Sequence, residues 1–196
     1  MDVLQTEIWK LISLGNEQAF AQAYTFYYKR FYNYGKKFTE DQLLLEDAIQ
    51  EALFTIWEKR SILLSLEYPA SYFYNAFRYI LFQKVKRAEK LVLNQHTEFD
   101  LEFSAEQILI KKETDQVLND KLKEALQELT SKQKEAIFLR FYEGLSYDEV
   151  ATILNISTKA TYKIMARALD KLKETMMISS SGILFLLRSA EWVQKM

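Results

Sequence analysis

The sequence of 196 residues contains no cysteine and a single histidine, His96. The lack of thiols excludes disulfides, thiolate metal sites and cysteine nucleophiles, and one histidine excludes a metal site built from several imidazoles. Four glycines and one proline are too few for the many tight turns of a β-sandwich or a β-barrel. These absences argue against metal or covalent catalysis.

Long apolar runs and targeting signals are also lacking. The longest apolar stretch near the C-terminus covers residues 183–187, far short of the ~20 residues that span a bilayer. The N-terminus lacks the basic start and the following apolar run of a signal peptide. We therefore expect no membrane insertion and a cytoplasmic location.

Neither sign of charge is in clear excess, because 26 basic residues face 27 acidic ones and the net charge is −1. The charges are nevertheless unevenly distributed along the chain. Residues 20–87 and 131–175 are mildly basic, whereas residues 88–130 between them are acidic. Two basic modules around an acidic connector give weak support for nucleic-acid binding.

Apolar residues recur at helical spacing through most of the chain, and no segment shows the alternation typical of a strand. We therefore predict an all-α protein of two small helical domains, at residues 1–90 and 121–176. Residues 91–120 are acidic and poorly periodic, and we interpret them as a linker. Residues 177–196 form an apolar tail, predicted either to cover the second domain or to dock on a partner.

The first domain is predicted to contain helices at about residues 17–38, 44–59 and 70–87. The middle helix has a predicted buried face of four aliphatic residues: Leu45, Ile49, Leu53 and Ile56. On its other side a second stripe falls at i, i+3, i+4 and i+7: Asp47, Gln50, Glu51 and Phe54. Acidic residues around an exposed aromatic side chain suit docking on a partner helix, and the alternative is a solvated face.

In the second domain, two predicted capping boxes mark helix starts. Thr130 with Gln133, and Ser146 with Glu149, have the spacing at which each side chain bonds the other residue's backbone N–H. The first box opens a helix that runs to about residue 142, and the second opens a helix of about two turns.

A tight turn at Asn155 and a longer helix capped by Ser157 follow, and this is the layout of a helix-turn-helix DNA-binding unit. The spacing predicts a buried face for the longer helix: Thr161, Met165, Ala168 and Leu172. The candidate DNA contacts are the cap and the outward residues: Ser157, Thr158, Lys159, Tyr162, Lys163 and Arg167. A three-helix hairpin with a solvated outer face fits the same periodicity.

Residues 129–174 closely resemble region four of bacterial RNA polymerase sigma factors of the sigma-70 family. The motifs that carry the resemblance are Leu129-Thr130, Arg140-Phe141, Glu143-Gly144-Leu145-Ser146-Tyr147, Ile156-Ser157 and Arg167-Ala168-Leu169. LuxR-type regulators share parts of this pattern. The resemblance implies that the longer helix recognises the minus-thirty-five promoter element.

The first half resembles sigma region two. The run from Asp47 to Trp57 is similar to the signature D-x-x-Q-E-x-F-x-x-x-W, with Leu53 where the signature has phenylalanine. The resemblance implies that the stripe of Asp47, Gln50, Glu51 and Phe54 binds the clamp helices of the large subunit of RNA polymerase core.

The segment from Tyr72 to Tyr79 resembles the W-L-x-x-I-A-R-N helix of region two, with Tyr79 in place of the asparagine. The resemblance implies melting and recognition of the minus-ten promoter element. The candidate residues are Tyr72, Asn75, Arg78, Lys84, Lys86 and Arg87. Phe73, Phe77 and Ile80 are instead expected in the core.

The chain leaves no room for a region-three domain and is identified as a short sigma factor of the extracytoplasmic-function type. This resemblance implies a non-enzymatic protein without metal or cofactor. Its implied partners are RNA polymerase core, promoter DNA and an anti-sigma factor. The alternatives are a helix-turn-helix regulator that acts without core polymerase, and an all-helical protein-interaction module.

Overall fold

The computed structural model describes residues 3–89, 121–122, 124–177 and 182–183. Every regular element in this described part is a helix, so the all-α prediction is confirmed. The chain divides into two compact units, residues 1–97 and 98–196. None of the helices within the described residues is both long and apolar enough to cross a membrane.

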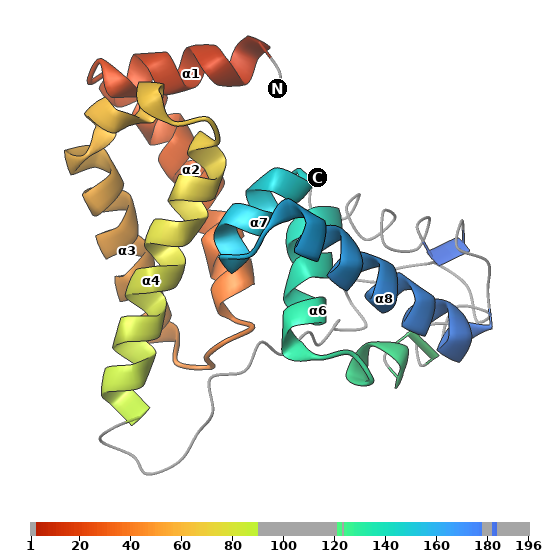
Figure 1. Cartoon of the computed structure of the whole chain (residues 1–196). Helices are drawn as coiled ribbons and strands as arrows, with labels where there is room; N and C mark the ends of the chain where they lie inside the picture. The colour runs from red at the N-terminus through yellow and green to blue at the C-terminus, as the bar shows by residue number, and fades with distance from the viewer. Residues whose placement is uncertain (1–2, 90–120, 123, 178–181, 184–196) are drawn as a thin grey trace, which may run out of the picture. The chain divides into compact units, whose positions relative to one another are not determined.

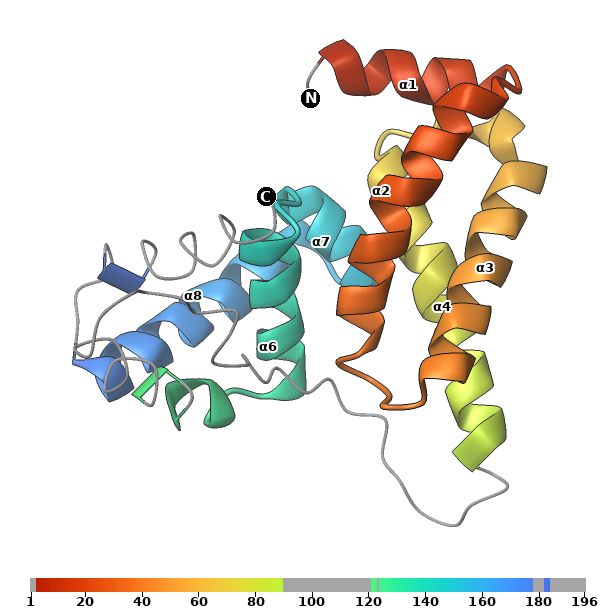
Figure 2. The same ribbon diagram turned by 180° about the vertical axis from the view of Figure 1, so that it is seen from behind.

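The first unit is a bundle with one helix laid across its end (Figure 1). Its elements are α1 (Val3–Ser13), α2 (Glu17–Gly35), α3 (Gln42–Glu58), the 3-10 helix η1 (Arg60–Ser65) and α4 (Pro69–Glu89). Helix α3 packs mainly against α4, and α1 packs against η1 and α2. The view from behind shows the same arrangement, with α1 across the end of the bundle (Figure 2).

Side-chain caps start two of these helices at or near the predicted residues. The Asn16 side chain accepts a hydrogen bond from the Ala19 amide at 2.8 Å, and that of Asp41 accepts one from the Leu44 amide at 3.0 Å. Each cap satisfies an amide that the first turn of a helix leaves without a partner. Helix α2 starts at Glu17 as predicted and ends at Gly35, three residues early.

Aromatic rings from α2 and α4 fill the core of the first unit. The rings of Phe31 and Phe77 stack with centroids 4.5 Å apart, and those of Tyr27 and Phe73 lie 4.5 Å apart. The predicted core positions Phe73 and Phe77 are confirmed, whereas Ile80 is only half-buried. The predicted buried face of α3 is also confirmed, since all four of its aliphatic residues are buried.

The second unit contains the three predicted helices as α6 (Ser131–Ile137), α7 (Tyr147–Leu154) and α8 (Thr158–Met176). One difference from the sequence prediction is a π-helical turn, η2 (Phe138–Tyr142), that continues α6. Here the Glu143 amide donates to the Phe138 carbonyl, five residues back, at 3.0 Å.

Both predicted capping boxes are present in the second unit. The Ser146 amide donates to Glu149 Oε2 at 2.7 Å, and the Glu149 amide donates back to Ser146 Oγ at 3.2 Å. Asn155 takes the left-handed conformation, with φ of 51°. The predicted inner face of α8 is buried along its whole length: Thr161, Met165, Ala168 and Leu172.

The predicted linker at 91–120, with His96, lies outside the described residues. Most of the tail at 177–196 does too, although Ile183 is described and is buried. The boundaries predicted for the domains, linker and tail therefore stay predictions.

Candidate functional site

The α3 stripe, made of Asp47, Gln50, Glu51 and Phe54, is exposed along one side of α3. Phe54 keeps 61% of its surface exposed, whereas its neighbour Leu53 is fully buried. Helix α3 therefore has one buried surface and one exposed surface, and the exposed one combines a large aromatic side chain with two carboxylates.

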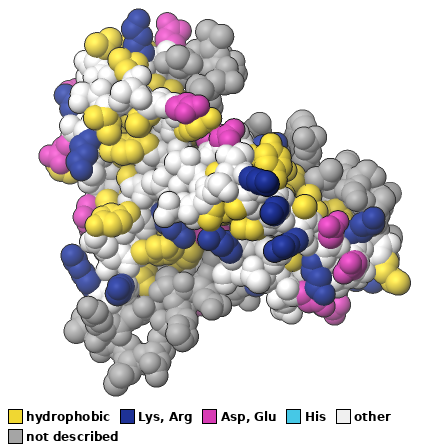
Figure 3. Space-filling model, in the orientation of Figure 1, with side chains coloured by type: hydrophobic (Ala, Val, Ile, Leu, Met, Phe, Trp, Pro, Cys, Tyr) yellow, Lys and Arg dark blue, Asp and Glu magenta, His cyan; other side chains and the backbone are white. Residues whose placement is uncertain are grey.

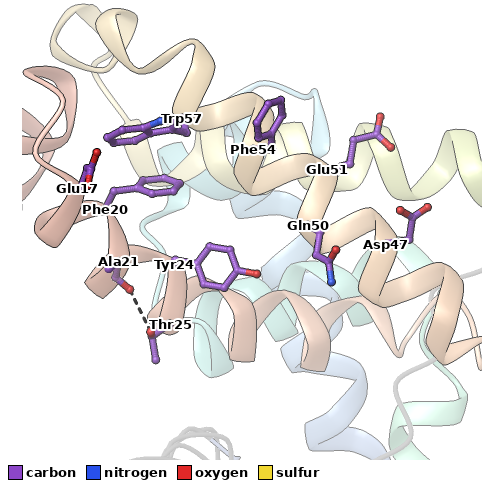
Figure 4. A pocket seen from close by; sticks show the side chains of 10 residues that line it. All are labelled: Glu17, Phe20, Ala21, Tyr24, Thr25, Asp47, Gln50, Glu51, Phe54 and Trp57. Atoms are coloured by element: carbon purple, nitrogen blue, oxygen red, sulfur yellow. Dashed lines mark hydrogen bonds between the residues drawn. The ribbon is translucent and has the colours of Figure 1, made fainter.

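A groove runs between the α3 stripe and α2 (Figure 4). Its lining consists of the stripe together with Glu17, Phe20, Ala21, Tyr24, Thr25 and Trp57. The Phe20 and Trp57 rings close one end, with centroids 4.6 Å apart. Gln50 points toward α2 in this view, whereas Glu51 and Phe54 point away from it.

Phe20 and Tyr24 of α2 belong to this groove. Both are half-buried, and the buried positions one residue earlier are Ala19 and Ala23. Small residues occupy the core positions only in the first two turns of α2, and large aromatic residues take them further along the helix. The two groove aromatics are the functional candidates that the sequence missed on α2.

Lys84 of α4 lies against the α3 stripe. Its Nζ is 2.6 Å from Asp47 Oδ2 and 2.6 Å from Glu51 Oε2. Hydrogen bonds to these two carboxylates raise the pKa of Lys84 above its usual value and outweigh the opposing effect of burial. The structure thus brings together a predicted DNA-binding lysine and two predicted polymerase-binding carboxylates.

The other candidates on α4 differ in exposure. Lys86 and Arg87 are exposed near the end of the helix, whereas Tyr72, Asn75 and Arg78 are half-buried. Burial raises the pKa of the Tyr72 hydroxyl above its usual range. The group therefore forms no single uniformly exposed surface.

Tyr79 is 66% exposed and is a further candidate on α4 that the sequence analysis left out. Its neighbour Arg78 lies with Cζ 4.5 Å from the centroid of the Phe82 ring. An exposed tyrosine ring is a suitable surface for stacking of an unpaired base.

The outer face of α8 carries four exposed candidates: Lys159, Tyr162, Lys163 and Arg167. We call the three cations among them (Lys159, Lys163 and Arg167) the basic ladder. They follow one another at intervals of four residues, and basic side chains gather over α8 in the space-filling view (Figure 3). Ser157 and Thr158, at the start of α8, are held by hydrogen bonds to the Ala160 amide and to Asp148 Oδ1 respectively.

An aromatic stack supports this outer face. The Tyr162 and Tyr147 rings are stacked with centroids 4.1 Å apart, and Arg140 Cζ lies 5.0 Å from the Tyr147 ring centroid. The Arg140 guanidinium also donates to the Leu145 carbonyl at 2.8 Å. Side chains of η2 and α7 therefore restrict the exposed tyrosine of α8.

Residues 119–172 match the family described as Sigma-70, region 4. The fold matches the structure of CnrH in complex with the cytosolic domain of CnrY, with 16% identity, a TM-score of 0.54, and coverage of 86% of this chain and 94% of that one. It also matches the sigma factor RpoE in complex with the anti-sigma factor NepR from Bartonella quintana. There the identity is 18%, the TM-score 0.54, and the coverage 82% of this chain and 98% of that one.

Residues 119–172 therefore contain a domain of the Sigma-70, region 4 family, and the fold of the chain is similar to those of the two solved structures. A search of curated proteins finds no match.

The acidic residues in the described part of the chain form no evident metal site. No group of three or more His, Cys, Asp or Glu residues that could hold a metal ion occurs among the described residues. The carboxylates of the α3 stripe bond a lysine instead, and those near α8 serve as caps or supports. The useful chemistry of the described surface is therefore ionic and aromatic.

Proposed function

We propose that this protein is a sigma factor that docks on core polymerase through the α3 stripe and directs it to promoters through α4 and α8. In this proposal α4 recognises and melts the minus-ten element and α8 reads the minus-thirty-five element. The observation that carries the docking part is the 61% exposure of Phe54 on a helix whose opposite face is fully buried.

The chemistry of the α3 stripe fits a basic helical partner such as the clamp helices of the large subunit. An aromatic side chain in the middle of an interface commonly supplies much of the binding energy, and charged residues around it set orientation. The adjoining groove extends this surface onto α2 with Phe20 and Tyr24. A helix lying along the groove would bury Phe54 and meet the carboxylates with its own cations.

The basic ladder supports the assignment of α8 as the recognition helix. Lysine and arginine at intervals of four residues lie along one side of a helix and can reach successive phosphates or guanine edges. Tyr162 lies on the same face and is held by the stack on Tyr147. Its ring can contact a thymine methyl group or a phosphate oxygen.

The exposed end of α4 supports a role at the minus-ten element. Tyr79 offers a stacking surface, and Lys86 and Arg87 add positive charge at the end of the helix. Stacking contributes about 1–3 kcal/mol per base, and basic side chains follow the backbone of a single strand.

An anti-sigma protein is a further proposed partner. The RpoE structure contains the anti-sigma factor NepR, and the CnrH structure contains the cytosolic domain of CnrY. We propose that a protein of this kind binds the present chain in competition with core polymerase. Since polymerase and its promoters are the targets, we place the protein in the cytoplasm.

Binding measurements with and without core polymerase test the proposal. We expect the purified protein to bind core, and we expect tight promoter binding only when core is present. A regulator that acts alone would instead bind an operator tightly as a free protein and show no affinity for core. An interaction module would keep its activity after alanine substitution of the whole basic ladder.

A further inference from the structure

Lys84 connects two surfaces to which the proposed function gives different partners. It belongs to α4, the helix assigned to the minus-ten element, yet its ammonium group lies between two carboxylates of the α3 stripe. Its side chain is only 19% exposed, whereas those of Asp47 and Glu51 are 66% and 52% exposed. The lysine is therefore the sheltered member of the group.

Asp47 and Glu51 stand one helical turn apart on α3. Two like charges at this spacing repel each other and are unfavourable on a helix. The Lys84 ammonium contacts Oδ2 of the first carboxylate and Oε2 of the second, both at 2.6 Å. One cation thus offsets the repulsion and fixes the directions of both side chains.

We propose that Lys84 is a positioning residue for polymerase docking, which holds Asp47 and Glu51 in the orientation that a basic partner meets, and is not a DNA ligand. This inference rests on the proposed docking role of the α3 stripe. To reach a phosphate, Lys84 would have to leave two carboxylates and a sheltered position. Lys86 and Arg87 on the same helix are exposed, unlike Lys84.

The carboxylates remain available to a partner while Lys84 holds them. More than half of each side-chain surface is exposed, and an ionised carboxylate has two oxygens that can accept several hydrogen bonds. Binding normally loses affinity for each side chain that has to be ordered at the interface. Because Lys84 orders two acidic side chains in the free protein, its removal is expected to weaken core binding by about fivefold or more.

The test compares Lys84→Gln with Lys84→Arg and with the matched control Lys10→Gln. Lys10 is exposed on α1 and lies outside the groove, and its substitution removes the same charge. Core affinity is measured at fixed ionic strength by competition with a labelled sigma factor, and melting temperature is measured for every variant. We expect Lys84→Gln to weaken core binding, and Lys84→Arg and Lys10→Gln to stay within about twofold of the wild type.

A variant with Asp47→Asn and Glu51→Gln separates failure of this inference from failure of the proposed function. Core binding unaffected by the double amide variant would remove the α3 stripe from the docking site. If the double variant binds weakly, Lys84→Gln added to it is expected to weaken binding no further. The inference is overturned if Lys84→Gln binds core like the wild type. It is also overturned if holoenzyme saturated with Lys84→Gln fails to open promoter DNA.

Discussion

Replacement of Phe54 by alanine separates a docking residue from a core residue. Complete burial of a phenylalanine contributes about 1.5–3 kcal/mol to folding. Because 61% of Phe54 remains exposed, its truncation is expected to lower the free energy of unfolding by only about 1 kcal/mol or less. An aromatic residue at the centre of an interface contributes about 2 kcal/mol or more, which corresponds to a roughly 30-fold loss of core affinity.

Leu53→Ala is the matched control, because Leu53 is the preceding residue of α3 and is fully buried. Its truncation should lower the free energy of unfolding by about 2–5 kcal/mol. At a temperature where both variants are folded, Leu53→Ala should bind core nearly normally and Phe54→Ala should not.

The two measurements are urea unfolding followed by circular dichroism and titration of fluorescent core polymerase with each variant. The reasoning is refuted if Phe54→Ala unfolds several kcal/mol more easily than the wild type while its core affinity is unchanged. That result would place Phe54 in the core, and the α3 stripe would then lack its proposed aromatic contact with core polymerase.

Three further predictions concern packing, capping and charge. Gly35→Ala should lower the melting temperature, because a Cβ there would lie 2.9 Å from Phe77 Cζ and overpacking costs about 1–3 kcal/mol. Ser146→Ala should destabilise the second unit by about 1 kcal/mol in urea unfolding, since its hydroxyl caps α7; an unchanged midpoint would contradict the capping role. Alanine substitution of the whole basic ladder should flatten the plot of log affinity against log salt for promoter binding by holoenzyme. The slope should fall in magnitude by up to about 3, at ~0.9 for each lost phosphate contact, and an unchanged slope would remove α8 from the DNA.

Local chemistry explains why most of the fold could be predicted. A capping box such as Ser146 with Glu149 acts over three residues, and the two faces of α3 follow from a 3.6-residue period. The left-handed turn at Asn155 likewise depends on one side chain. Each of these features depends on residues that are close together in the sequence, and the structure contains each of them.

Long-range contacts explain why parts of the candidate site could not be predicted. Lys84 and Asp47 are 37 positions apart, and their pairing depends on how α3 packs against α4. The stack of Tyr147 on Tyr162 depends in the same way on the angle between α7 and α8. No periodicity within one helix reports the direction of a side chain toward another helix.

The groove residue Phe20 illustrates a third reason. Large aromatic side chains are usually good markers of a core, yet α2 buries the small Ala19 and Ala23 and leaves Phe20 half-exposed beside α3. Residue size is therefore a poor marker of the core side in the first two turns of α2.

Reconstituted transcription tests the central claim most directly. Purified bacterial core polymerase is mixed with this protein and with genomic DNA, and all run-off transcripts are sequenced. We predict transcripts that start at a defined set of promoters, require the protein, and are strongly reduced with Phe54→Ala. Absence of any start site that depends on the protein would contradict its assignment as a promoter-directing sigma factor.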